Sequence, residues 1–170
     1  PGKCYVMRAK PGPVARLLPS AHAVEREFAV MSGLQGTDVP VPHMYCLCED
    51  ESVVGRAFYI MEFMQGRVLW DQALPDMDPA GRGAIYNEMN RVIAALHKVP
   101  FAERGLANYG KPGNYFERQI GRWSKQYVAS VTQSIPEMDQ LMQWLPGHIP
   151  ASALDTSKVS IVHGDFRLDN

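Results

Sequence analysis

Two residues with chemically useful side chains, Asp165 and Asn170, stand five positions apart near the end of the sequence. They follow a β-branched run at 159–162 in the stretch IVHGDFRLDN, so a strand is expected to run directly into a loop. Gly164 allows the backbone to turn sharply where that strand ends. A loop of this length can fold back and present a carboxylate and an amide to one cleft. The alternative is an ordinary turn, because Gly and Asp are common turn formers.

The pattern H-G-D, four further residues and N resembles the catalytic loop of aminoglycoside phosphotransferases and choline kinases, a relative of the H-R-D loop of protein kinases. The resemblance implies transfer of the γ-phosphate of ATP to a hydroxyl of a small molecule, a reaction that depends on positioning and charge. Asp165 would accept or orient the proton of the acceptor hydroxyl, and the side-chain oxygen of Asn170 would coordinate Mg²⁺. His163 is expected to pack or hydrogen-bond within the loop, and Arg167 and Asp169 to be solvated or paired locally.

Two upstream residues match the kinase-like requirement for a basic side chain on a small-lobe strand and a carboxylate on the following helix. By resemblance, the strand YVMR places Arg8 where it would pair with the phosphates of ATP, and the segment VEREF places Glu27 as its partner. The family has Lys where this chain has Arg8, and a guanidinium differs from an ammonium in reach and geometry. Lys10 is the second candidate, on the same strand face if the strand continues. Taken alone, Glu27 would be a surface helix residue beside Arg26.

The segment YIMEFMQG resembles the hinge between the two lobes of this fold. There, main-chain groups near Glu62, Phe63 and Met64 would hydrogen-bond the adenine edge of ATP. Only backbone atoms do this work, so the side chains carry little of the signal. An edge strand that ends at a glycine turn explains the segment equally well when it is taken alone.

Two longer stretches, LPSAHAVEREF and KPGNYFERQIGRW, resemble more narrowly the phosphotransferase-type domain that is fused to acyl-CoA dehydrogenases in some proteins. This resemblance implies a hydroxylated acyl acceptor rather than an aminoglycoside, and a fused acyl-CoA dehydrogenase domain as a partner. The alternative is a nucleotide- or ligand-binding pseudoenzyme that regulates a fused or partner enzyme, which the Lys-to-Arg departure at Arg8 favours. Protein kinase activity is less well supported, because nothing in the chain resembles an activation segment.

Hydrophobic patterns predict the elements that must position these residues. Strands are expected at 3–9, 44–48, 56–63 and 159–162, and helices at 20–36, 78–97, 114–130 and 136–145, with Ser20 as the N-cap of the first helix. A strand, a helix and two strands precede the hinge, and mainly helices follow it before a last strand, which predicts an α+β chain with a small sheet-bearing lobe and a helical lobe. The family resemblance implies that this is a protein kinase-like fold with two lobes. We expect a partial small lobe at 1–61, the hinge at 62–66, and a partial helical lobe at 67–170 that ends in the catalytic loop.

Both ends of the chain fall within expected strands or loops of this fold, so we expect it to be incomplete at both ends. By resemblance, the glycine-bearing hairpin over the phosphates would precede Gly2, and a second metal-binding Asp would follow Asn170. Without that Asp, Mg²⁺ would keep one protein ligand. We therefore expect no useful catalytic activity from these 170 residues alone, and robust formation of ADP by them would contradict this expectation.

Charge and composition argue against several classes of partner. The chain has 17 Lys and Arg against 18 Asp and Glu with no long run of one sign, so nothing indicates a nucleic-acid groove or an anionic membrane surface. No apolar run approaches the roughly 18 to 20 residues that span a bilayer. Cys4, Cys46 and Cys48 lack a spacing typical of disulfides, which predicts a reducing, cytoplasmic compartment. Cys46 and Cys48 are expected to be buried structural thiols.

Overall fold

The computed structural model describes residues 2–11, 23–111 and 113–170. Contacts divide the chain into two compact units, Pro1–Tyr109 with Ser160–Asn170, and Gly110–Val159. The first unit combines a small sheet with helices and contains every candidate site residue named above. The predicted α+β class is therefore confirmed, while the division into lobes at 62–66 stays a prediction.

The sheet of the first unit is antiparallel, with the strand order β1-β3-β2. Its strands are β1 (Tyr5–Ala9), β2 (Met44–Cys48) and β3 (Phe58–Glu62), in agreement with three of the predicted strands. The short helix α2 (Glu51–Val54) joins β2 to β3, and Asp50 caps it by accepting a hydrogen bond from the Ser52 N–H. In the register of the sheet, Arg8 lies opposite Tyr59, so both side chains lie on one face.

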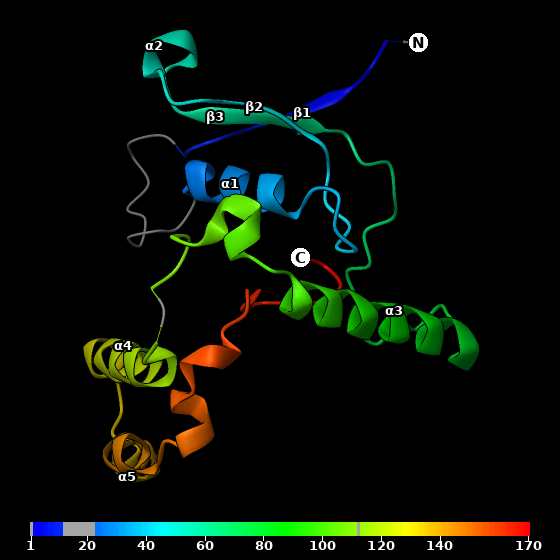
Figure 1. The fold of residues 1–170 in the computed structure, drawn as a ribbon. Helices are drawn as coiled ribbons and strands as arrows, with labels where there is room; N and C mark the ends of the chain where they lie inside the picture. The colour runs from blue at the N-terminus through cyan, green and yellow to red at the C-terminus, as the bar shows by residue number, and fades with distance from the viewer. Residues whose placement is uncertain (1, 12–22, 112) are drawn as a thin grey trace. The chain divides into compact units, whose positions relative to one another are not determined.

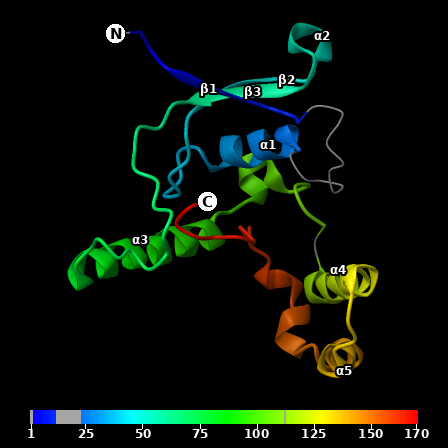
Figure 2. The same ribbon diagram turned by 180° about the vertical axis from the view of Figure 1, so that it is seen from behind.

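Helix α1 (Val24–Leu34) covers this face of the sheet, and Figures 1 and 2 show the packing from two opposite sides. Its apolar stripe buries Val24 in a first core cluster with Met44, Ala57 and Tyr59. The predicted N-cap, Ser20, lies outside the described residues. Burial of the apolar stripe of α1 against the sheet is thus what fixes the helix that carries Glu27.

The long helix α3 (Pro79–Lys98) begins after Asp78, as predicted. The Asp78 carboxylate accepts a hydrogen bond from the Gly81 N–H at 2.6 Å, and Pro79 stands in the first turn, where a backbone N–H has no helical partner. Near its C-terminal end, α3 joins the end of α1 in a second core cluster. That cluster consists of Leu34, Val39, Leu96 and Val99, with the partly buried Ile161 packed against it. The segment that leads into the H-G-D loop is therefore held by the core.

Gly33 in α1 determines how closely this helix approaches the short kinked segment η1 (Ala102–Leu106). A Cβ at Gly33 would lie 2.8 Å from Leu106 Cδ1 and 3.0 Å from the Arg104 carbonyl oxygen. Because Leu106 is only 3% exposed, it has no free space to enter. We expect Gly33→Ala to lower the free energy of unfolding by about 1–3 kcal/mol, measured by denaturant unfolding of the full-length protein.

The matched control for this prediction is Gly83→Ala in α3, where no atom lies within 4 Å of the added Cβ. There the higher helix propensity of alanine is expected to raise the stability by up to about 1 kcal/mol. Equal effects of the two substitutions would contradict the steric explanation.

The second unit contains α4 (Tyr115–Ser130) and α5 (Pro136–Trp144), which confirm the helices predicted at 114–130 and 136–145. Three 3₁₀ turns follow them: η2 (Leu145–His148), η3 (Ala151–Leu154) and η4 (Thr156–Lys158). None of the described side chains of this unit is buried. Two short helices leave much of each other's surface uncovered, which explains the exposure.

The predicted strand at 159–162 is wrong. In the described part of the chain, these residues are not assigned to any strand and pair with none. A β-branched run becomes a strand only when a neighbouring strand accepts and donates its backbone hydrogen bonds. Side-chain packing of Ile161 on the second core cluster holds the segment in place instead.

The expectation of two buried thiols is also wrong. Cys46 is exposed and Cys48 is half-buried, and both are free. They pair with Ile60 and Phe58, which alternate with the side chains that α1 covers, so the two cysteines lie on the opposite face of the sheet. Among the described residues, no helix has the length and apolar character needed to cross a membrane.

Candidate active site

The H-G-D loop turns at Gly164, whose φ of +85° falls in the left-handed region that favours glycine. The Asp165 N–H donates a hydrogen bond to His163 Nδ1 at 3.4 Å. The His163 ring also meets the Phe166 ring edge to face, with 5.4 Å between the ring centroids. These contacts confirm that His163 hydrogen-bonds the loop backbone and packs within the loop.

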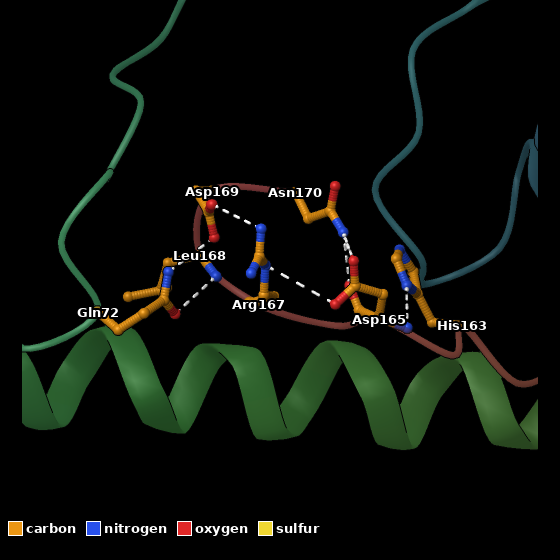
Figure 3. Close-up of polar contacts among 7 residues, drawn as sticks. All are labelled: Gln72, His163, Asp165, Arg167, Leu168, Asp169 and Asn170. Carbon is orange, nitrogen blue, oxygen red and sulfur yellow. Dashed lines mark hydrogen bonds and ion pairs between the residues drawn. The ribbon is translucent and has the colours of Figure 1, made fainter. Parts of the chain in front are cut away.

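The structure brings Asp165 and Asn170 together, as predicted. Asn170 Nδ2 donates to Asp165 Oδ2 at 2.6 Å and to the Asp165 carbonyl oxygen at 2.8 Å. A carboxylate only accepts hydrogen bonds, so the amide nitrogen must face it. The amide oxygen of Asn170 therefore points away from Asp165, as Figure 3 shows. The Asp165 side chain is 66% exposed.

Arg167 lies between the two acidic side chains of the loop. Its Nε is 3.7 Å from Asp165 Oδ1, and its Nη2 is 2.9 Å from Asp169 Oδ2. The local pairing predicted for Arg167 and Asp169 is therefore confirmed. The guanidinium places a permanent positive charge beside the Asp165 carboxylate.

Gln72 ties the end of the loop to the segment that precedes α3, a contact that the sequence analysis missed. Its Nε2 donates to Asp169 Oδ1 at 2.8 Å, and its Oε1 accepts from the Leu168 N–H at 3.2 Å (Figure 3). The Gln72 carbonyl oxygen accepts from the Tyr86 hydroxyl at 2.5 Å, which anchors this segment to α3. No local signal marks Gln72, because its two partners in the loop lie 96 and 97 residues away.

Substitution of Gln72 is expected to loosen the loop. Gln72→Ala removes both hydrogen bonds, so we expect faster amide exchange at 165–170 and a kcat lower by about tenfold. Gln72→Glu should be more damaging, because a carboxylate cannot donate to Asp169 and repels it. Hydrogen exchange with mass spectrometry on the full-length protein measures the first effect. Gln126→Glu on the exposed face of α4 is the control, and equal exchange in all three variants would contradict the role of Gln72.

The structure also joins Arg8 to Glu27. Arg8 Nε donates to Glu27 Oε2 at 2.5 Å and its Nη2 donates to Glu27 Oε1 at 3.0 Å, which makes the pair bidentate. The hydrogen bond to Glu27 raises the pKa of Arg8 above its ordinary value. Lys10, the second candidate, instead lies 3.1 Å from Glu25. The Glu27 carboxylate has a third donor in addition to the two Arg8 nitrogens. The buried hydroxyl of Tyr59 donates to Glu27 Oε2 at 2.9 Å, a contact that the sequence analysis did not include.

The three hinge candidates are not equivalent. The Glu62 N–H donates to the His43 carbonyl oxygen at 2.8 Å, and its carboxylate accepts from the His43 N–H at 3.1 Å. Pairing with the residue before β2 therefore occupies the Glu62 N–H. Phe63 and Met64 are exposed, and their N–H groups form no hydrogen bond with the residues that the structure describes.

Two groups of site residues thus lie within the first unit, one around Arg8 and Glu27 and the other around Asp165 and Asn170. Among the described residues, no hydrogen bond or ion pair links the two groups.

Comparison with known proteins places the chain in a family. The sequence profile of the phosphotransferase enzyme family matches residues 2–170. The chain belongs to this phosphotransferase family. The similarity to a solved structure is also high: the crystal structure of a candidate aminoglycoside phosphotransferase from Ralstonia eutropha is 65% identical with a TM-score of 0.88, over 100% of this chain and 48% of that one. The kinase-like fold expected for this phosphotransferase-family chain is confirmed.

The curated relatives include two proteins that are named as acyl-CoA dehydrogenases. "Acyl-CoA dehydrogenase family member 10" of Mus musculus is 47% identical over 97% of this chain and 15% of its own length. "Probable acyl-CoA dehydrogenase IBR3" of Arabidopsis thaliana is 49% identical over 99% of this chain and 21% of its own length. This phosphotransferase-family chain thus spans about a fifth or less of the length of these relatives. The predicted similarity to domains of acyl-CoA dehydrogenase proteins is confirmed.

Proposed function

We propose that the protein containing this phosphotransferase domain transfers the γ-phosphate of ATP to a hydroxyl of a small molecule. The observation that carries the proposal is the pairing of Asp165 with Asn170, which leaves the carboxylate exposed and directs the amide oxygen away from it. One loop then offers a group for a hydroxyl and a group for a cation, the division of labour that phosphoryl transfer requires.

In this proposal, Asp165 accepts a hydrogen bond from the acceptor hydroxyl and orients its oxygen for attack, taking the proton as the new O–P bond forms. ATP supplies the phosphoryl group, and ADP leaves as the bond between the γ-phosphorus and its bridging oxygen breaks. Arg167, beside Asp165, contributes fixed positive charge to the loop. Asn170 keeps the Asp165 carboxylate in place through its amide nitrogen.

Arg8 is proposed to bind the phosphates of the nucleotide, held by Glu27. Two of its N–H groups are used by Glu27, and a guanidinium has five, so donors remain for phosphate oxygens. The backbone N–H groups of Phe63 and Met64 are proposed to bind the adenine edge. The Glu62 N–H pairs with the His43 carbonyl oxygen. Glu62 is therefore proposed to help place the hinge backbone beside the adenine rather than to donate a hydrogen bond to it.

The donor atoms of the loop fit Mg²⁺. An amide oxygen and a carboxylate are hard oxygen ligands, the type that Mg²⁺ prefers. Among the described residues, no cluster of three or more His, Cys, Asp or Glu side chains forms a metal cage. In this proposal the cation is held by one or two protein oxygens together with phosphate oxygens and water. Asn170 is the proposed ligand in this chain, and a further Asp after it stays a prediction.

We propose a hydroxyacyl compound as the acceptor, a fused acyl-CoA dehydrogenase domain as a partner and the cytoplasm as the location. The names of the curated relatives support the acceptor class and the partner, since both are acyl-CoA dehydrogenases that extend well beyond the matched region. A pseudoenzyme that binds a nucleotide or an acyl ligand is the second candidate, favoured by the arginine at position 8.

An ADP-release assay on the full-length protein separates the two candidates. With ATP and Mg²⁺, we expect ADP formation that depends on a hydroxyacyl acceptor and exceeds the rate with aminoglycosides or choline analogues. A shift in melting temperature with ATP but no ADP formation with any acceptor would favour the pseudoenzyme. Preference for an aminoglycoside would retain phosphoryl transfer and overturn the acceptor class.

A further inference from the structure

Tyr59 is among the largest fully buried side chains of the described residues, with 1% of its surface exposed. It lies in the first core cluster, and its ring centroid is 6.2 Å from that of Phe28 on α1. Close packing of this kind holds a ring in one orientation. A tyrosine buried so deeply needs a hydrogen-bond partner for its hydroxyl.

That partner is the carboxylate of Glu27. The Tyr59 hydroxyl donates to Glu27 Oε2 at 2.9 Å, and the same oxygen accepts from Arg8 Nε at 2.5 Å. Burial, followed by the hydrogen bond to Glu27, raises the pKa of Tyr59 well above its ordinary value of 10.0, so the hydroxyl stays protonated and donates. Three elements, β1, β3 and α1, meet at this one carboxylate.

Neither member of the Arg8–Glu27 pair is fixed by burial. The Arg8 side chain is 47% exposed and that of Glu27 is 30% exposed, so both reach water, whereas the Tyr59 side chain does not. Tyr59 is the rigid member of the group. Its hydroxyl restricts Glu27 to orientations in which both carboxylate oxygens face the guanidinium.

We propose that Tyr59 is a positioning residue: its buried hydroxyl holds Glu27, and through Glu27 the Arg8 guanidinium, in the orientation that binds the phosphates of a nucleotide. The inference rests on the proposed function in one respect, the assignment of Arg8 to the phosphates. A hydroxyl that only satisfied its own hydrogen bond would affect stability but not nucleotide affinity.

A double-mutant cycle on the full-length protein separates these roles. Tyr59→Phe keeps the ring and removes only the hydroxyl, and we expect it to raise the Kd for ATP with Mg²⁺ about fivefold, measured by calorimetry. We expect Glu27→Gln to raise it about tenfold, and the double variant to match Glu27→Gln alone rather than the product of the two effects. The same lack of additivity is expected for the denaturation midpoint of the nucleotide-free protein. Tyr45→Phe, at an exposed position of β2, is the control and should leave both quantities unchanged.

A Tyr59→Phe variant that folds and binds ATP like the wild type overturns the inference. The inference is also overturned if the increases in the Kd for ATP caused by Tyr59→Phe and Glu27→Gln multiply in the double variant. If the wild-type protein does not bind ATP, the proposed function fails and the role of Tyr59 fails with it. If the wild-type protein binds ATP and the Tyr59→Phe variant binds it equally well, the inference about Tyr59 is wrong and the proposed function is unaffected.

Discussion

Asp165→Asn in the full-length protein is expected to lower kcat by about 10²–10⁴-fold, because an amide cannot take the proton of the acceptor hydroxyl. The substitution keeps the size and shape of the side chain, and the loop remains anchored by Gln72 and by Ile161. The Kd for ATP should therefore change by no more than about threefold, since Asp165 acts on the acceptor. Steady-state kinetics and calorimetry measure the two quantities separately.

Asp76→Asn is the matched control for this prediction. Asp76 is exposed and lies outside the loop, so kcat should remain that of the wild type. Retained turnover in Asp165→Asn would remove Asp165 from the mechanism. A loss of ATP binding as large as the loss of kcat would instead mean that Asp165 acts on the nucleotide site.

Arg8→Ala is expected to lower kcat/KM for ATP by about 10²–10³-fold, the usual effect of removing one charged donor from a preorganised site. Two donors of Arg8 are committed to Glu27, so the loss combines a missing phosphate ligand with an unpaired carboxylate. Arg8→Lys should recover only part of the activity, because an ammonium cannot make the bidentate pair.

Lys10→Ala decides between the two basic residues that the sequence leaves open. Lys10 pairs with Glu25 rather than with Glu27, and both side chains of that pair are substantially exposed. We expect kcat/KM for ATP to change by less than about threefold in this variant, in line with the small effects of surface ion pairs. A larger loss in Lys10→Ala than in Arg8→Ala would exchange the roles of the two residues.

The parts of the fold that were predicted correctly carry local signals. Asp78-Pro79 begins α3 because both residues suit a helix start, and β2 matches its predicted bounds because prolines precede it and an acidic turn follows it. The strand predicted at 159–162 failed because a strand needs a partner, which no local pattern reveals. The exposure of Cys46 depends on which face of the sheet α1 covers, and that too is a tertiary property.

The candidate site likewise contains residues that local sequence predicts and residues that it does not. Asp165 and Asn170 lie in one short loop, and their spacing together with the family resemblance predicted that both would face one cleft. The direct hydrogen bond between their side chains was not predicted. The pairing of Arg8 with Glu27 was expected from a resemblance and agrees with the geometry. Gln72 and Tyr59 were missed because each reaches its partner across the fold. For Tyr59, the sequence signal was a hydroxyl-bearing side chain at a core position of β3, which needs a hydrogen-bond partner.

The fate of the γ-phosphate tests the central claim most directly. Phosphorus NMR of the full-length protein with ATP, Mg²⁺ and a hydroxyacyl acceptor would follow every phosphorus atom in the reaction. We predict a phosphomonoester signal on the acceptor that grows in step with ADP and is lost in Asp165→Asn. Release of inorganic phosphate with ADP, and no phosphomonoester with any hydroxyl acceptor, would contradict phosphoryl transfer by this loop.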